Sequence, residues 1–120
     1  MRVLVTGGAG RLGINVCKTF IKDGFQVRVF DLDNERNRKS IKELGRKAEI
    51  LWGDVTQPDS VRKALEGVDV VVHMAGILPP VAYERPDLAR RVNVGGTQIV
   101  VDLIKEKGGQ IPLIFTSSVA

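Results

Sequence analysis

Residues 1–13 read MRVLVTGGAGRLG, a short apolar run that passes without a break into glycines. Arg2–Thr6 is rich in β-branched and apolar residues and predicts a strand. A helical pattern begins at Leu12, so the glycines lie between a strand and a helix. They fit G-x-G-x-x-G when read from Gly8 and G-x-x-G-x-x-G when read from Gly7. A strand, a glycine turn and a helix in this order predict the first unit of a parallel α/β sheet.

The alternation of strand and helix patterns continues along the chain. The strand segments are nearly continuous in apolar residues, as in strands buried on both faces of a parallel sheet. Expected strands are Arg2–Thr6, Gln26–Asp31, Glu49–Gly53, Val68–His73 and Pro112–Thr116. Expected helices are Leu12–Lys22, Glu35–Leu44, Pro58–Glu66 and Pro86–Lys107. With right-handed crossovers, this pattern predicts one α/β domain over residues 1–120, a doubly wound parallel sheet of order 3-2-1-4-5 with an incomplete C-terminal half.

Composition excludes several classes of function. The net charge is +4, but Lys and Arg alternate with acids, as in DLDNERNRKSIKELGRKAE, which predicts no basic face for nucleic acid. The single cysteine, Cys17, excludes an intrachain disulfide and is expected in the core, and no Cys/His cluster predicts a metal site. No apolar run approaches the ~20 residues of a membrane span, and the apolar start is too short for a signal peptide. We expect a cytoplasmic protein without nucleic-acid or membrane partners.

Three of the glycines have distinct expected roles in a phosphate-binding turn. Gly7 would turn the chain sharply off the strand, and Gly10 would let the backbone approach a pyrophosphate. Gly13 would let the helix pack tightly on the sheet. The N-terminus of the helix adds free N–H groups and a partial positive charge. The alternative is a tight turn between strand and helix without a ligand.

Asp31 provides a second, independent signal. It closes the second expected strand, 18 residues after Gly13. An acid near this distance binds the adenosine ribose hydroxyls in dinucleotide-binding proteins. The alternative is an aspartate that only begins the loop after the strand. Together with the glycines, Asp31 favours a dinucleotide site.

Five motifs in chain order resemble those of the extended short-chain dehydrogenase/reductase superfamily, in its branch of NAD-dependent epimerases and dehydratases. TGGAGRLG resembles TGxxGxxG, and GDVTQPDSV resembles the family's GD-(V/L)-x-D stretch. VVHMAG resembles the HxAA/HxAG strand end, NVGGT the NxxGT helix motif and FTSSVA the SSxxVYG strand. The resemblance covers essentially all 120 residues. It implies an NAD(P)-binding Rossmann fold with an oxidoreductase-type site.

The resemblance also implies where the cofactor would lie. Arg11 and Leu12 would lie over the pyrophosphate, and Asp31 with its following loop would hold the adenosine ribose. Asp54 and Val55 would lie at the adenine ring. Met74, Ala75 and Gly76 would run along the cofactor from the ribose to the nicotinamide. Asn93 would reach the cofactor from the long helix.

The reacting oxygen and the choice of cofactor are implied in the same way. Ser118 takes the place of the family's catalytic serine, which hydrogen-bonds the reacting oxygen. NAD is favoured over NADP because no basic residue directly follows Asp31, although Arg11 and Arg36 could accept a 2′-phosphate.

Several of these residues have simpler interpretations. Asp54 could begin the turn before Pro58, and Asn93 could mark a helix kink. His73, on a buried strand, fits a packed core histidine better than a catalytic base. The TSS segment at residues 116–118 could be an ordinary polar strand end.

The family's acid–base pair, YxxxK, has no counterpart in residues 1–120, because the single tyrosine, Tyr83, is followed four residues later by Asp87. The chain is therefore expected to be a fragment that ends before that helix and the substrate domain, or a naturally short product. As a fragment it would be the cofactor-binding portion of an NAD-dependent epimerase, dehydratase or dehydrogenase with a small-molecule substrate, a nucleotide sugar being favoured.

Other functions remain open. The chain could be a non-catalytic NAD(H)-binding module, or an interaction protein of this fold without a ligand. It could also belong to a threonine-dehydrogenase- or hydroxysteroid-dehydrogenase-like member of the same branch. The outer edge of the last strand, IPLIFTSS, predicts self-association, so we expect a homo-oligomer.

Overall fold

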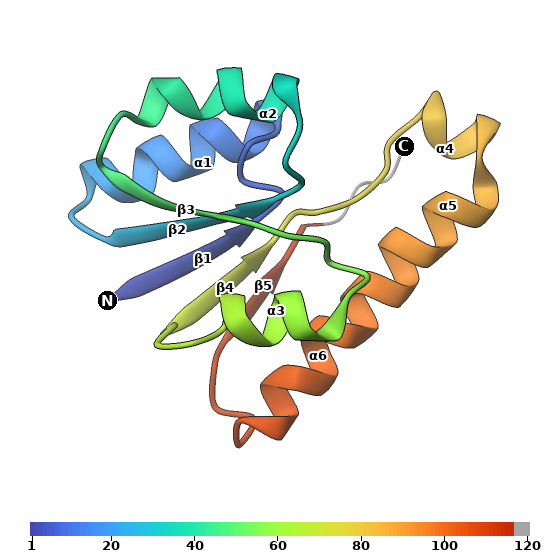
Figure 1. Ribbon diagram of the computed structural model, residues 1–120. Coiled ribbons are helices and arrows are strands. Elements are labelled where there is room, and N and C mark those ends of the chain that lie inside the picture. The colour runs from blue at the N-terminus through green and yellow to red at the C-terminus, as the bar shows by residue number, and fades with distance from the viewer. Residues whose placement is uncertain (117–120) are drawn as a thin grey trace.

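The computed structural model describes residues 1–116 and contains one parallel sheet flanked by helices (Figure 1). All neighbouring strands pair in parallel, in the order β3-β2-β1-β4-β5. This confirms the predicted strand order. The strands are β1 Arg2–Thr6, β2 Gln26–Asp31, β3 Ala48–Trp52, β4 Val70–His73 and β5 Leu113–Phe115.

The two faces of the sheet bury different sets of side chains. Alternate residues of β1 point to opposite faces, so Val3 and Val5 pack on one side and Leu4 on the other. Figure 1 shows α1 (Arg11–Lys22) and α2 (Glu35–Ser40) over one face, and α3 (Pro58–Ala64) and α6 (Thr97–Glu106) over the other. The core beneath α3 and α6 includes Leu4, Phe30, Val61, Leu65, Val71, Val100 and Leu103.

The buried face of α1 differs from the predicted stripe. The spacing of Leu12, Val16 and Phe20 predicts one apolar stripe on this helix, but Leu12 is 62% exposed. The buried residues of α1 are Gly13, Ile14 and Cys17. Gly13 packs against the backbone of the glycine turn, and Ile14 and Cys17 pack with the valines of β1 and β2. Leu12 instead lies exposed in the first turn of α1, after the glycines. Cys17 lies in the core, as expected.

The expected long helix over Pro86–Lys107 is divided into three segments. They are α5 (Pro86–Arg90), a π-helical turn η2 (Arg91–Gly96) and α6. The two glycines of η2 have different surroundings: a Cβ at Gly96 would lie 2.8 Å from Val55 Cγ1, whereas a Cβ at Gly95 would meet nothing within 4 Å. Close packing of Val55 therefore explains Gly96.

A short helix, α4 (Val81–Glu84), lies between the expected strand Val68–His73 and the expected helix from Pro86, where the sequence predicts no helix. Together with α5 it forms an arm that projects beyond the carboxyl ends of the strands (Figure 1). Tyr83 in this arm and Leu78 just before it are exposed. No helix within residues 1–116 is both long and apolar enough to cross a bilayer.

Arg28 is a buried cation that supports the fold. It lies on β2, only 7% exposed, and donates to the carbonyl oxygens of Ala64 and Glu66 at 2.6 and 2.7 Å. Its Nε also donates to Glu49 Oε1 at 3.1 Å. These carbonyls lie at the C-terminus of α3, where a positive charge is favourable. The guanidinium therefore fixes α3 to the sheet.

Candidate functional site

The glycine turn joins the carboxyl end of β1 to α1. Gly7 has a φ of +70°, and a Cβ there would lie 2.7 Å from the backbone nitrogen of Ala75. A Cβ at Gly13 would collide with the carbonyl oxygen of Gly7. Both positions therefore need glycine for the fold itself: Gly7 for the turn and the approach to β4, and Gly13 for the packing of the helix.

Gly10 lies in a more open place. It is the N-cap residue of α1, with φ −72° and ψ 171°, a conformation that any residue can adopt. A Cβ there would have one near neighbour, the carbonyl oxygen of Gly7 at 3.2 Å. Within residues 1–116, no side chain caps this end of α1. The first-turn N–H groups of a helix have no partner within the helix, and such groups bind phosphate. The turn thus fits a pyrophosphate at Gly10 through Leu12.

Asp31 lies beside this turn, at the carboxyl end of β2. One carboxylate oxygen accepts from the Ala9 N–H at 3.1 Å, and the other accepts from the Leu32 N–H at 2.8 Å. Burial raises the pKa of Asp31, while these two hydrogen bonds and the charge of Arg36 act in the opposite direction. An acceptor of this kind can bind a ribose hydroxyl next to the phosphate turn.

The segment that follows β4 forms another wall of the site. The Thr6 hydroxyl accepts from the N–H groups of Met74 and Ala75, at 3.0 and 3.2 Å. The Asn93 amide binds both backbone groups of Ile77: its oxygen accepts at 2.7 Å and its nitrogen donates at 3.0 Å. The segment 74–76 is therefore held at both ends. Its backbone runs beside Gly7 at the carboxyl edge of the sheet.

Asn93 is close to Gly76 as well. A Cβ at Gly76 would lie 3.1 Å from Asn93 Oδ1. The π-helical turn η2 thus presents Asn93 to the loop after β4, rather than only marking a kink. In the described structure the amide is occupied by the loop backbone.

His73 is buried at the end of β4, 1% exposed. Its Nδ1 lies 2.7 Å from Thr6 Oγ1, and its Nε2 lies 3.0 Å from Thr97 Oγ1. Burial lowers the pKa of the ring. These contacts favour the interpretation of His73 as a satisfied core histidine over that of a base open to substrate.

Asp54 and Val55 occupy the turn between β3 and α3. Asp54 Oδ1 accepts from the N–H and the hydroxyl of Thr56, at 2.9 and 2.7 Å. Val55 packs in the core against Gly96. Asp54 therefore organises the turn before Pro58. Because the Val55 side chain is in the core, only its backbone is available to a ligand at this edge.

Ser118 lies outside the described residues. Thr116, the last described residue, has its hydroxyl 3.5 Å from the carbonyl oxygen of His73. The ring of Phe115 stacks against His73, with centroids 6.0 Å apart. The end of β5 thus lies beside the end of β4, at the same edge of the sheet as the glycine turn.

Comparison with known proteins identifies the family. The sequence pattern of the 3-beta hydroxysteroid dehydrogenase/isomerase family matches residues 4–120. The chain belongs to this family. The resemblance to the extended short-chain dehydrogenase/reductase superfamily is thereby confirmed.

Individual relatives agree with this assignment. The chain is 36% identical over 118 residues to mouse 3 beta-hydroxysteroid dehydrogenase type 7, covering 96% of this chain and 32% of the mouse protein. It is 35% identical over 122 residues to 3 beta-hydroxysteroid dehydrogenase/Delta 5-->4-isomerase of Mycobacterium tuberculosis, covering 98% of this chain and 31% of that protein. The chain thus spans about a third of the length of these relatives.

A solved structure shows the same fold. UDP-glucose 4-epimerase from Brucella ovis, in complex with NAD, is similar with a TM-score of 0.82 and 27% sequence identity. The match covers 98% of this chain and 36% of the epimerase. The parallel Rossmann fold is therefore shared between this member of the 3-beta hydroxysteroid dehydrogenase/isomerase family and an NAD-bound epimerase.

Sequence reasoning missed two threonines of the site. Thr6 and Thr97 hold His73 from both sides, and Thr6 also holds the loop after β4. A polar residue at the end of the buried β1 strand was one available signal for Thr6. The spacing of four between Asn93 and Thr97, which places both on one helix face, was the signal for Thr97.

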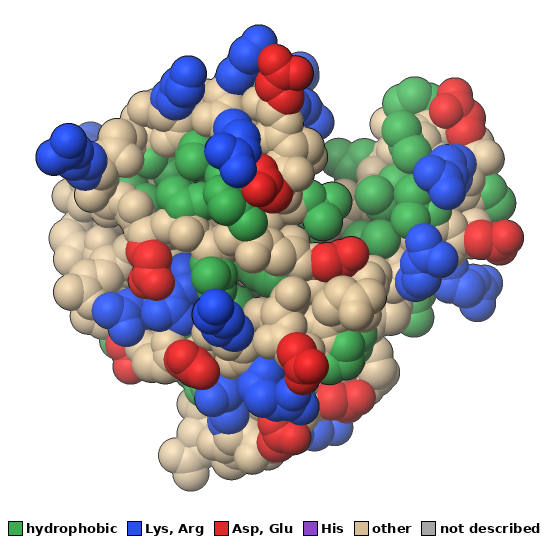
Figure 2. All heavy atoms as spheres, in the orientation of Figure 1, with side chains coloured by type: hydrophobic (Ala, Val, Ile, Leu, Met, Phe, Trp, Pro, Cys, Tyr) green, Lys and Arg blue, Asp and Glu red, His purple; other side chains and the backbone are tan. Residues whose placement is uncertain are grey.

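On the face that Figure 2 shows, the charged side chains of the described residues are of both signs. Figure 2 shows basic and acidic side chains interspersed over the visible face, with apolar side chains along the arm. A hollow of about 550 Å³ over α2 is lined by Glu35, Arg36, Lys39 and Ser40. Among residues 1–116, no group of three or more His, Cys, Asp or Glu side chains could hold a metal ion.

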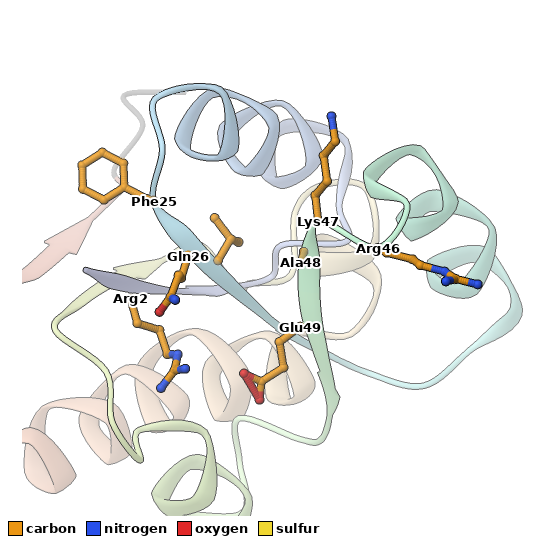
Figure 3. Close-up of a pocket in the computed structure, with 8 residues that line it drawn as sticks. Arg2, Phe25, Gln26, Arg46, Lys47, Ala48 and Glu49 are labelled. Atoms are coloured by element: carbon orange, nitrogen blue, oxygen red, sulfur yellow. The ribbon is translucent and has the colours of Figure 1, made fainter.

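Another hollow, of about 360 Å³, lies at the amino ends of β1, β2 and β3 (Figure 3). Arg2, Arg46, Lys47 and Glu49 line it. Figure 3 shows Arg46 and Lys47 pointing away from Arg2, and Glu49 is bound to Arg28. Its basic side chains therefore do not converge on an anion.

Proposed function

We propose that residues 1–120 are the NAD-binding N-terminal portion of an NAD-dependent oxidoreductase of the 3-beta hydroxysteroid dehydrogenase/isomerase family. The observation that carries the proposal is the pairing of the uncapped N-terminus of α1, open at Gly10, with the Asp31 carboxylate beside it. A phosphate donor set and a ribose acceptor thus lie next to each other. The NAD in the similar Brucella ovis epimerase supports NAD as the ligand.

Under this proposal each part of the carboxyl edge binds one part of NAD. The glycine turn and the first turn of α1 hold the pyrophosphate, Asp31 holds the adenosine ribose, and the turn after β3 lies at adenine. The segment after β4, supported by η2, runs toward nicotinamide. The proposed cofactor-binding residues are Gly7, Gly10, Arg11, Leu12, Gly13, Asp31, Asp54, Val55, Met74, Ala75, Gly76 and Asn93.

The proposed chemistry is oxidation of an alcohol to a ketone, for which bound NAD supplies the hydride acceptor. Residues of this chain bind and orient, and Ser118 hydrogen-bonds the reacting oxygen. A group tuned near the working pH must take the hydroxyl proton. In the superfamily this group is the tyrosine of YxxxK, which residues 1–120 do not contain. We therefore assign the catalytic helix and the substrate domain to residues outside this sequence.

The family match favours a steroid-like secondary alcohol as the substrate of the whole protein, because relatives at 35–36% identity are 3 beta-hydroxysteroid dehydrogenases. A nucleotide sugar is the second candidate. It is supported by the structural similarity to UDP-glucose 4-epimerase at 27% identity.

NADH titration tests the proposed cofactor site. Trp52 is the single tryptophan and lies directly beside Asp31 in the sheet register. NADH bound at this edge should quench Trp52 emission by energy transfer in a saturable way. Added NAD should reverse the quenching, whereas nicotinamide mononucleotide, which lacks the adenosine half, should not.

The control is Trp52→Phe, which should abolish the signal. Absence of saturable quenching at millimolar NADH, in the upper range of typical enzyme affinities, would contradict the proposal.

A further inference from the structure

The hydrogen bonds around His73 allow one arrangement of protons. The Thr97 hydroxyl lies 2.6 Å from the carbonyl oxygen of Asn93, which can only accept, so Thr97 donates there. A hydroxyl has one proton, so toward His73 Nε2 the Thr97 oxygen can only accept. Nε2 therefore carries the ring proton.

The other side of the ring fits the same arrangement. The Thr6 hydroxyl accepts from the Ala75 N–H at 3.2 Å and shares the Met74 N–H with the Thr6 carbonyl oxygen, each at 3.0 Å. With Nε2 protonated, the Thr6 hydroxyl donates its own proton to Nδ1 at 2.7 Å, and its lone pairs stay with these N–H groups. A second proton on the ring would compete with the two N–H groups for the same oxygen. The hydrogen bonds on both sides of the ring thus favour the neutral Nε2–H tautomer.

This network joins two walls of the cofactor site. Thr6 is the last residue of β1, directly before the glycine turn, and its hydroxyl holds the Ala75 N–H. Gly7 packs against the backbone of Ala75. On the other side, Thr97 lies one turn after Asn93, whose amide holds Ile77. The His73 ring is the bridge between these two supports.

We propose that His73, as the Nε2–H tautomer, is a positioning residue that fixes the backbone of segment 74–76 for NAD. The inference rests on the proposed function for its effect on NAD, but not for its effect on the backbone. A purely space-filling histidine would stabilise the core without requiring one tautomer or one threonine partner.

The first test is the state of the ring in the unmodified chain. His73 is the single histidine, so the long-range proton–nitrogen NMR spectrum contains one imidazole. We expect a protonated Nε2 and a bare Nδ1 at neutral pH. An Nδ1–H tautomer, or the mixture that free histidine shows, would overturn the proposal without any substitution.

The second test removes the acceptor for Nε2–H while keeping the shape of the side chain. In Thr97→Val, the hydrogen-exchange rate of the Ala75 amide should rise about tenfold, because one hydrogen bond that supports this segment is lost. NAD affinity should fall by a similar factor. Thr97→Ser should restore both values. Thr19→Val is a matched control, because Thr19 makes the same helix hydrogen bond, to Asn15 O at 3.0 Å, on α1.

Thr19→Val should leave Ala75 exchange and NAD affinity unchanged. Ala75 exchange in Thr97→Val within twofold of the unmodified chain would overturn the proposal. So would a Thr97→Ser variant that behaves like Thr97→Val. If the unmodified chain does not bind NAD, the proposed function fails, while the tautomer and the exchange rates still decide the role of His73.

Discussion

The Asp31 carboxylate accepts a hydrogen bond from the Ala9 N–H at 3.1 Å, joining the end of β2 to the glycine turn after β1. The acid expected to bind ribose and the turn expected to bind pyrophosphate are thus held together without a ligand. Burial raises the pKa of this carboxyl, because its charged form carries a desolvation cost in the folded chain. Such a cost is expected where a charge serves binding rather than stability.

Replacing Asp31 should therefore change cofactor preference. In Asp31→Ala, NAD affinity should fall about tenfold to hundredfold, because a charge-assisted hydrogen bond to the ribose is lost. NADP affinity should fall less or rise, because its 2′-phosphate no longer faces a carboxylate. Calorimetric titration of both nucleotides measures the ratio. An equal loss for the two nucleotides would remove Asp31 from the ribose site.

The two neighbouring glycines of η2 should respond in opposite directions to alanine. Gly95→Ala meets nothing within 4 Å and should stabilise the chain by about 0.5–1 kcal/mol, through helix propensity. Gly96→Ala would place its Cβ 2.8 Å from Val55 and should destabilise it by about 1–3 kcal/mol. Denaturant unfolding measures both. Equal effects of the two substitutions would contradict the packing of Val55 under Gly96.

Stability should decrease in mild acid because of His73. Burial lowers the pKa of the folded ring below its ordinary value of about 6.5. Well above that pH the ring is neutral in both states. As the pH falls below it, the unfolded chain binds a proton that the folded chain does not. The free energy of unfolding then decreases by at most about 1.4 kcal/mol per pH unit, until the pH reaches the folded pKa.

Denaturant unfolding between mildly acidic and neutral pH measures this slope. The His73 ring faces Thr6, Thr97 and Phe115, none of which is charged. His73→Gln is the control, and its unfolding free energy should vary less over the same range. A slope unchanged by this substitution would assign the pH dependence to other groups.

The sheet was predictable because its signals are local. The buried strand Val70–His73 is apolar up to its last residue, and a glycine turn separates β1 from α1. The order of the strands then follows from right-handed crossovers. The face of α1 was harder to predict, because Leu12 matches the apolar period but lies exposed in the first turn. Gly13 packs against the glycine turn instead, and Ile14 and Cys17 face the sheet.

The candidate site was only partly predictable. The spacing of the glycines and the position of Asp31 at a strand end can be read from the sequence, because these roles depend on the glycine backbone and on the carboxylate itself. The partners of His73 cannot be read in this way, because the Thr6–His73 and His73–Thr97 pairs lie 67 and 24 residues apart in the sequence and meet only in the folded sheet. Asp54 looked equally like a turn residue and a ligand, and its bonds to Thr56 support the turn.

The most direct test of the account is NAD binding by Gly10→Val, measured by calorimetry beside the unmodified chain. The backbone at Gly10 suits any residue, and its Cβ would have one close neighbour, so thermal unfolding should show a folded variant. NAD affinity should fall by at least about tenfold, because the side chain occupies the approach to the first turn of α1. A folded Gly10→Val chain that binds NAD as tightly as the unmodified chain would contradict the phosphate role of this turn.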